Sequence, residues 1–426
     1  MQGLQDTAEQ ALALMHAQGF EHAQVDAVLS LQDELNIAHN EPSLLRSTET
    51  RRLALLGIFD GRKASTEMSD FAPGQLQARI ASLLADARSA PRDDANAVSA
   101  GQAANIVQGP QEGESGLLAD KVAELLEFRS QHTPKMHLEE GLAAHALVRR
   151  CSLTSGGSQL VSSVGCYAMS VMGSSREGSQ VSSFNFCGGN TNDLGLRHAS
   201  SFFGIGDMMR ASQRQIVAAP IGERFTGSVV LTPNAASDLV EWLLEQINDN
   251  HLIGGSSLYL DRVGQRIGSP LFTLKSRFDA PGVAAVSADG FATAPVEIVR
   301  AGTLLTLTPS LYASRKTGIP HVPLAASGWE VTAGETARDQ LVAAVQRGAL
   351  VDRLSMGNPA PNGDFSGVIK NSFVIEGGNV GRALSETMIS GNIAQMLQDV
   401  TAVSSERIDT GGWLLPWLQI EGLHFS

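Results

Sequence analysis

The stretch that most constrains the fold covers residues 225–250 and reads FTGSVVLTPNAASDLVEWLLEQINDN. Residues 228–231 form a short apolar, β-branched run, as in a buried strand. Thr232 then offers an N-cap hydroxyl, and Pro233 suits the first helical position, where its missing N–H costs nothing. The apolar residues that follow recur at helical spacing, and polar side chains fall on their flanks. We therefore predict a strand, a sharp turn and a helix lying across a sheet, with a buried face of Leu239, Val240, Leu243, Leu244 and Ile247 and with Asp238, Glu241, Glu245 and Gln246 on its flanks.

The rest of the chain mixes short strand and helix patterns, which predicts an α+β fold. We expect mixed, largely antiparallel sheets with packed helices, in an N-terminal part and a larger C-terminal part. Apolar residues at helical spacing predict helices at 7–18, 73–88, 117–128, 335–346 and 392–400. Alternating or apolar runs predict strands at 23–31, 35–38, 43–48, 52–59, 63–67, 271–275, 296–300, 303–308, 366–376 and 382–389.

Glycine-rich and serine-rich segments suggest where strands turn and where domains divide. Asp60-Gly61 is typical of a tight hairpin turn, and turns are also predicted at 155–158 and 173–175. Residues 89–114 lack hydrophobic periodicity and are predicted to be a linker or an extended connection. We expect an N-terminal α+β domain at 1–112, a strand-rich middle segment at 113–220 and a C-terminal α+β domain at 221–426.

Charge and cysteine usage limit the partners and the compartment. The formal net charge is −13, which disfavours direct contact with nucleic-acid phosphates. No segment reaches the roughly 18 apolar residues of a membrane span, and the acidic N-terminus is unlike a signal peptide. Three widely spaced cysteines indicate neither a disulfide framework nor a metal knuckle. We expect a cytoplasmic protein that binds neither nucleic acid nor membranes.

Scattered residues offer weak catalytic candidates. His137 and His145 lie eight positions apart, a spacing that favours ordinary surface histidines over a metal site. His321, in the Gly-Ile-Pro-His turn, is the best isolated candidate for a cleft residue, although a structural role is favoured. Cys187 could be a nucleophile beside a histidine, but a buried small hydrophobe is the better interpretation. The glycine pairs lack the phosphate-binding patterns, so turns explain them better.

The opening stretch, the Gly-Gly-Ser-Ser of 254–257 and the distal PNGDFSG and ISGN segments resemble the TldD/PmbA (TldE) family, which is peptidase U62-like. In the catalytic TldD branch, the equivalent helix carries HExxxH, and a C-terminal cysteine is a third zinc ligand. The resemblance puts Glu241 and Gln246 at the two histidine positions and Trp242 at that of the general base. No HExxH or HExxxH occurs in the chain, and residues 404–426 contain no cysteine. The match is therefore to the PmbA/TldE branch.

This resemblance implies a non-catalytic subunit of a cytoplasmic two-component metallopeptidase that processes or degrades peptides. Zinc is then expected in a TldD-like partner, and no metal or cofactor in this chain. Asp364, within PNGDFSG, is a candidate cleft residue by the same resemblance, although Asp, Asn and Ser also suit an ordinary turn, which is the favoured interpretation. Family members have also been described as modulators of DNA gyrase, which nothing in these residues supports.

Two other functions stay open at this point. The chain could be a peptidase in its own right, with a metal bound by scattered His, Asp and Glu side chains. It could also be a peptide-binding homodimer without catalysis. Metal content after purification without chelator separates the first alternative from the partner role, and co-purification with a TldD-like chain separates the second.

We predict that Cys151, Cys166 and Cys187 are free thiols in the folded protein. Titration of the denatured chain without reductant should count three thiols. A lower count would contradict the prediction and the assignment to a reducing compartment.

Overall fold

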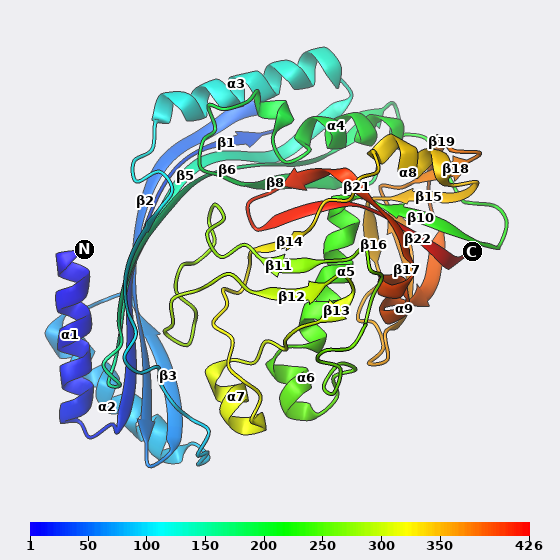
Figure 1. Cartoon of the computed structure of the whole chain (residues 1–426). Helices are drawn as coiled ribbons and strands as arrows, with labels where there is room; N and C mark the ends of the chain where they lie inside the picture. Colours follow the sequence, from blue (N-terminus) through cyan, green and yellow to red (C-terminus); the bar gives the residue numbers. More distant parts are fainter.

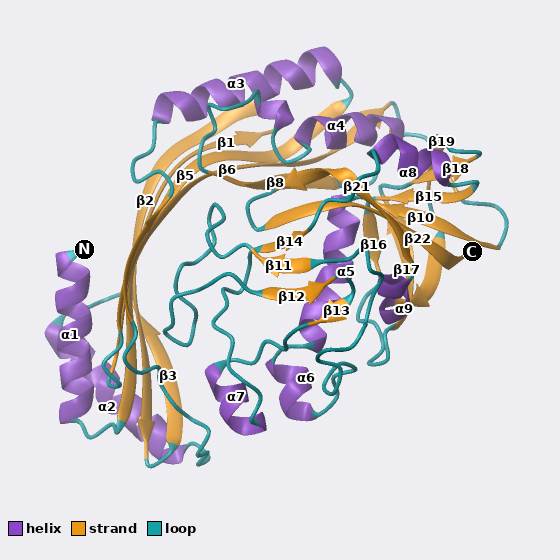
Figure 2. Cartoon of the chain, viewed as in Figure 1, coloured by secondary structure: helices purple, strands orange, loops and turns teal.

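A computed structural model describes residues 1–426, except for the side chain of Pro73. Figure 1 shows a long, curved sheet that arches around the C-terminal half of the chain, with the two termini on opposite sides of the molecule. Figure 2 shows helices on the outer side of the arch, and loops, short strands and further helices on its inner side. The α+β fold, in an N-terminal and a larger C-terminal part, is confirmed.

The curved sheet has eight strands in the order β3-β2-β1-β5-β6-β4, with β7 and β8 also paired to β6. Its neighbours along β3, β2, β1, β5 and β6 are antiparallel, and β4 is parallel to β6. The strands are β1 (His22–Ala38), β2 (Glu41–Phe59), β3 (Arg62–Met68), β4 (Ala103–Gln108), β5 (Met136–Thr154), β6 (Gln159–Glu177), β7 (Gln180–Val181) and β8 (Asn185–Thr191).

The alternation of side chains in this sheet separates its two faces. Val25, Ala27 and Leu53 are buried against helices on the outer face. Their neighbours Asp26 and Arg52 point to the opposite, inner face, because successive side chains of a strand alternate. The covering helices are α1 (Gln2–Ala17), α2 (Pro73–Ser89), α3 (Ser115–His132) and α4 (Ile205–Arg214).

The second sheet has fourteen strands of mixed direction, and its main path runs β13-β12-β11-β14-β22-β10-β15-β18-β19-β9. Its strands are β9 (Ala218–Ala219), β10 (Phe225–Leu231), β11 (Leu274–Ser276), β12 (Glu297–Arg300), β13 (Thr303–Leu304), β14 (Trp329–Val331), β15 (Arg347–Val351), β16 (Arg353–Ser355), β17 (Asp364–Lys370), β18 (Phe373–Glu376), β19 (Asn379–Leu384), β20 (Met388–Asn392), β21 (Val400–Asp409) and β22 (Trp413–Phe425). The helices of this half are α5 (Pro233–Gln246), α6 (Asp249–Gly254), α7 (Leu311–Thr317), α8 (Arg338–Ala344) and α9 (Ile393–Gln398).

The predicted strand, turn and helix are confirmed in β10 and α5. The Thr232 hydroxyl accepts a hydrogen bond from the Ala235 amide, 3.4 Å away, and so caps the helix. Leu239, Val240, Leu243 and Ile247 are fully buried in the largest apolar core, which α5 shares with strands of the second sheet. Leu244, also predicted on this face, is only partly buried. Gln246, predicted on a flank, is buried.

Several other expected boundaries are wrong because strands are longer than local patterns suggest. The predicted runs between residues 23 and 59 merge into two long strands, β1 and β2. The turn at 155–158 is confirmed, but the predicted turn at 173–175 lies inside β6. Gly173 pairs with Leu138 of β5, at the point where the register of β5 against β6 shifts between Leu138 and Glu140. A side-chain carbon on Gly173 would lie 2.0 Å from the His137 carbonyl oxygen. Glycine therefore permits a β-bulge here, rather than a turn.

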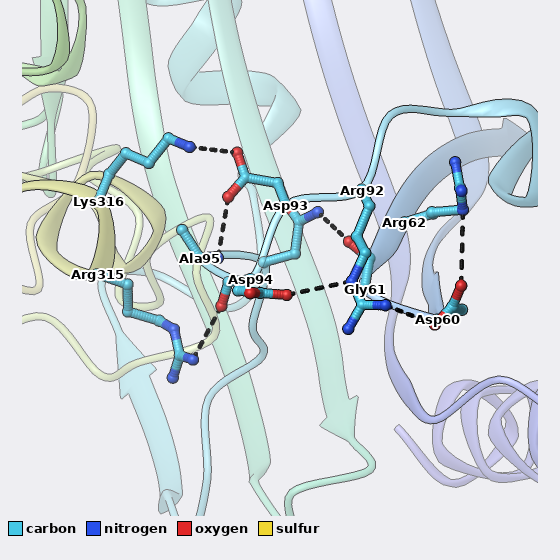
Figure 3. A network of polar contacts seen from close by, with 10 residues as sticks. Asp60, Gly61, Arg62, Arg92, Asp93, Asp94, Ala95, Arg315 and Lys316 are labelled. Atoms are coloured by element: carbon cyan, nitrogen blue, oxygen red, sulfur yellow. Dashed lines mark hydrogen bonds and ion pairs between the residues drawn. The ribbon is translucent and has the colours of Figure 1, made fainter.

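The segment predicted as a linker is ordered and attaches to the C-terminal half. Part of it forms β4, which pairs with β6. Figure 3 shows the preceding residues, where Asp93 bonds to Lys316 of α7 at 2.7 Å and the Asp94 carbonyl accepts from Arg315 at 3.1 Å. The bond from Lys316, with those from the Ala95 amide and the Tyr312 hydroxyl, lowers the pKa of Asp93 to about 2. The segment thus connects the arch to α7.

Leu243→Asp should destabilise the fold on the order of 4 kcal/mol, because it places an unpaired charge in the core. Urea unfolding measures this change. Glu245→Asp, two residues further along the helix on its exposed face, is the matched control and should leave the midpoint nearly unchanged. Equal midpoints for Leu243→Asp and wild type would show that the buried face is misassigned.

Candidate functional site

A cleft of about 900 Å³ lies between the inner face of the curved sheet and α5. Asp26, Arg52 and Arg150 line it from β1, β2 and β5. Glu241 and Glu245 line it from α5, and the loop that contains Asp289 closes another side. The cleft therefore combines residues more than 200 positions apart in the sequence. This position, between two halves of the molecule, is where ligand sites commonly form.

The face of α5 toward the cleft carries an acidic pair. Glu241 and Glu245 are exposed and four residues apart, which places them on the same side of the helix. Burial raises the pKa of Glu241, and the charge of Glu245 raises it further. Among the described residues, neither carboxylate has an ion-pair partner. Both carboxylates remain available to a ligand.

The other charged groups of the cleft are already engaged. Arg150 pairs with Asp26 at 2.6 Å and also donates to the Val286 carbonyl, which joins the curved sheet to the opposite wall. Arg52 pairs with Glu67 at 2.5 Å. Asp249 accepts the Ser310 amide, and so helps to position the start of α7. The unbalanced charge of the cleft is negative, because Glu241 and Glu245 of α5 and also Asp249 and Asp289 line it without a Lys or Arg partner in the described part of the chain. Negative charge suits a cationic or hydrogen-donating ligand.

The other two positions of the degenerate motif face away from the cleft. Trp242 is buried, with its ring edge-on to Tyr259 at 6.2 Å between centroids. Gln246 is buried, and its Oε1 accepts the Leu258 amide at 3.2 Å. Gly363, with φ +90°, lets the PNGDFSG loop pass beside Trp242: a side-chain carbon there would lie 3.1 Å from the ring. Trp242 and Gln246 thus stabilise the core and neighbouring loops.

The two isolated candidates, His321 and Asp364, do not line the cleft. His321 is largely buried, contacts Asp289 at 3.3 Å and packs against the Phe291 ring. It therefore supports the wall, since Asp289 lines the cleft and His321 itself does not. Asp364 begins β17, outside the cleft lining, and accepts hydrogen bonds from Asn362 and Asn392, which lower its pKa. These bonds give Asp364 a role in the turn.

The three cysteines are free, and Cys187 lacks the features of a nucleophile. Its thiol donates to the Phe203 carbonyl at 2.8 Å, and burial raises its pKa to about 12. A thiol with so high a pKa carries almost no thiolate near neutral pH.

One possible metal-ligand group occurs among the described residues, at His39, His137 and Glu139, whose donor atoms lie within 4.8 Å of one another. His145 is elsewhere, bonded to the Pro110 carbonyl. Asn40 donates its amide to Nδ1 of His137, so the neutral ring carries its proton on Nε2, the atom nearest Glu139. Arg176 also pairs with Glu139. The group therefore suits a hydrogen-bonded strand end better than a metal site.

The sequence missed the residues of the curved sheet that line the cleft. Asp26 lies between buried residues of its strand, and Arg150 lies next to a buried residue of its own. This alternation predicts that they lie on the exposed face of a sheet, but it does not predict which residues they contact. Glu245 was predicted only as a flank of its helix. Their grouping depends on long-range packing, which no local signal encodes.

Comparisons with known protein sequences match about half of the chain. Residues 225–426 match the family model described as the PmbA/TldA metallopeptidase C-terminal domain. The chain is 27% identical over 217 residues to a protein named metalloprotease PmbA homolog in Haemophilus influenzae, and 25% identical over 205 residues to metalloprotease PmbA in Escherichia coli O157:H7. Each match covers 46% of this chain, and 46% and 45% of those relatives, so the chain spans about half the length of the curated relatives it matches.

Solved structures share the whole fold. A candidate modulator of DNA gyrase from Bacteroides thetaiotaomicron superposes with a TM-score of 0.85 at 20% identity, covering 99% of this chain and 98% of that one. TldE from Thermococcus kodakarensis superposes with a TM-score of 0.82 at 18% identity, covering 99% and 100%. In the described part of this chain, no helix is both long and apolar enough to cross a membrane.

The cleft-facing helix offers a pH test, because burial raises the pKa of Asp238 in α5 to about 6. This carboxyl takes up a proton on folding, so its contribution to stability is complete below its unfolded pKa and is lost as the pH rises through about 6. Asp238→Asn should therefore stabilise the protein by roughly 1 to 3 kcal/mol at pH 7.5.

Urea unfolding at pH 7.5 and pH 4 measures this difference, and the gain should disappear at pH 4. Asp364→Asn is the control, since the pKa of Asp364 is lowered and its loss brings no such gain. A gain for Asp238→Asn that is equal at both pH values would show that ionisation of Asp238 is not its cause.

Proposed function

We propose that this chain is a member of the PmbA/TldE family and the non-catalytic subunit of a cytoplasmic two-component metallopeptidase that processes or degrades peptides; the match of residues 225–426 to the family model supports this. Its partner is a TldD-like chain that binds the zinc ion. This chain itself carries no metal and contributes binding surface. We assign the zinc to the partner because α5 of this chain lacks the set of side chains that binds zinc in a peptidase.

The observation that carries this proposal is the composition of α5 at the cleft. A peptidase zinc site needs imidazole, thiolate or carboxylate donors in close array and a carboxylate that accepts a proton from the bound water. Of the three motif positions, only Glu241 both faces the cleft and offers a donor. Trp242 cannot accept a proton, and the Gln246 amide is a poor ligand that already bonds within the core.

The remaining groups of the cleft support a binding role. Glu241 and Glu245 present negative charge without partners among the described residues, which favours basic side chains or the amino terminus of a peptide. The main path of the curved sheet ends at β3 and β4, and that of the second sheet ends at β13 and β9. Strands at sheet edges can bind an extended peptide through main-chain hydrogen bonds.

Glu241→Ala should change the activity of a reconstituted two-chain complex by no more than a few-fold, because this carboxylate contributes charge and not chemistry. The measurement is peptide hydrolysis by a TldD-like chain from the same host, mixed with wild-type or variant protein. Glu376→Ala, an exposed carboxylate at the end of β18, is the matched control.

Co-purification and thermal melting establish whether the variant still assembles and folds. A variant that fails to co-purify with the partner should lose the activity of the mixture. Loss of activity in Glu241→Ala, with assembly and melting temperature intact, would mean that this chain contributes chemistry, and would overturn the proposal.

A further inference from the structure

A second cavity, of about 850 Å³, lies at the opposite end of α5 from the acidic cleft. Asn234 and Ser237, near the start of the helix, line this second cavity, whereas Glu241 and Glu245 line the cleft. Trp413 lines both spaces and lies between them. The remaining walls come from α4, β8 and the strands around β15 and β18. Its volume is that of a site for a ligand of several hundred daltons.

The walls of the second cavity are largely apolar. They are formed by aromatic and aliphatic side chains, among them Phe186, Phe203, Met208, Leu350, Phe373 and Trp417. Phe186 remains 54% exposed although it is aromatic and lies on a strand, β8. Covering this surface with an apolar group would remove it from water, a favourable change of about 25 cal/mol per Å².

Hydrogen-bond acceptors come together on one wall. Asp352 follows β15, and its backbone amide bonds to the Ser372 hydroxyl, next to Asn371. Oδ1 of Asn371 is buried without a hydrogen-bond partner. Thr232 donates to one carboxylate oxygen of Asp352 at 2.8 Å, yet among the described residues Asp352 has no ion-pair partner. Burial raises the pKa of Asp352, and a cation beside it would offset that cost.

Hydrogen-bond donors come together on another wall, at the end of α4. The Arg214 guanidinium lies over the Phe373 ring at 4.3 Å and donates to the Gly381 carbonyl. It forms no ion pair among the residues described. Gln215 accepts from Asn185 through Oε1, which fixes its amide, and its Nε2 is buried without a partner. A buried donor left unpaired costs about 1 to 3 kcal/mol, so it calls for a ligand or an ordered water.

The other charges of this cavity already cancel in pairs. Asp207 pairs with Arg210 at 3.0 Å, and Asp339 pairs with Arg338 at 3.1 Å. Only the Asp352 carboxylate and the Arg214 guanidinium, among the described charged groups that line the cavity, have no ion-pair partner. An unpaired acceptor atom accompanies the carboxylate, and an unpaired donor atom accompanies the guanidinium.

We propose that the second cavity binds short peptides with apolar side chains and two free ends. The ammonium end contacts Asp352 and Asn371, the carboxylate end contacts Arg214 and Gln215, and the apolar side chains pack on the aromatic walls. The site is separate from the acidic cleft, and binding is a property of this chain alone. The inference therefore does not depend on a TldD-like partner or on peptidase activity.

The test is isothermal titration of the purified full-length chain with leucyl-phenylalanine. We expect saturable binding at one site per chain. Acetylation of the amino terminus, or amidation of the carboxyl terminus, should each weaken binding about tenfold or more, because each removes a charged hydrogen bond. Free leucine is a separate arm: if it binds as tightly as the dipeptide, the site recognises amino acids by the same two ends.

Variants identify the cavity. Asp352→Asn, Arg214→Met and Gln215→Met should each weaken dipeptide binding about tenfold or more, whereas Arg79→Gln on the exposed surface of α2 should not. Melting curves without peptide show that each variant folds. The proposal is overturned if the dipeptide does not bind at millimolar concentration, or if folded Asp352→Asn and Arg214→Met bind it as the wild type does.

A crystal of the chain soaked in the dipeptide gives an independent outcome. Density for the peptide between Asp352 and Arg214 supports the proposal. Ordered water on Asn371 Oδ1 and Gln215 Nε2, with no peptide in the cavity, contradicts it.

Discussion

The burial of one face of α5 is the constraint on which the rest of the molecule depends. Leu239, Leu243 and Ile247 are fully removed from water in the core that fills the C-terminal half. Because a helix has a fixed periodicity, burying these residues determines which side chains face the opposite direction. Glu241 and Glu245 then face the curved sheet and add negative charge to the cleft. A change in the helix register would alter the core and the site together.

The same helix is the basis of the proposal that this chain binds peptides without cleaving them. Trp242, which the resemblance puts at the position of the general base, packs against Tyr259 and the PNGDFSG loop. Gln246 accepts a hydrogen bond from the Leu258 amide inside the protein. An indole and a buried carboxamide are unsuited to proton transfer or zinc binding.

The sequence predicted those features that depend on interactions between residues close together in the chain. The cap on α5 and the Asp60-Gly61 hairpin follow from the conformations that these residues prefer. The lengths of β1 and β2 were not predicted from the sequence, because polar residues on the inner face interrupt the hydrophobic pattern. Asp26 and Arg150 reach the cleft through pairing of strands 124 residues apart, and the second cavity likewise joins distant segments. Sequence patterns do not report such proximity.

The division of labour between two chains is tested most directly by a three-way peptidase assay. This chain, a TldD-like chain from the same host and their mixture are each purified without chelator, assayed on unfolded peptide and analysed for zinc. The account predicts activity in the mixture, no activity in this chain alone, and zinc that accompanies the TldD-like chain. Peptide hydrolysis by this chain alone, with stoichiometric zinc bound to it, would contradict the account.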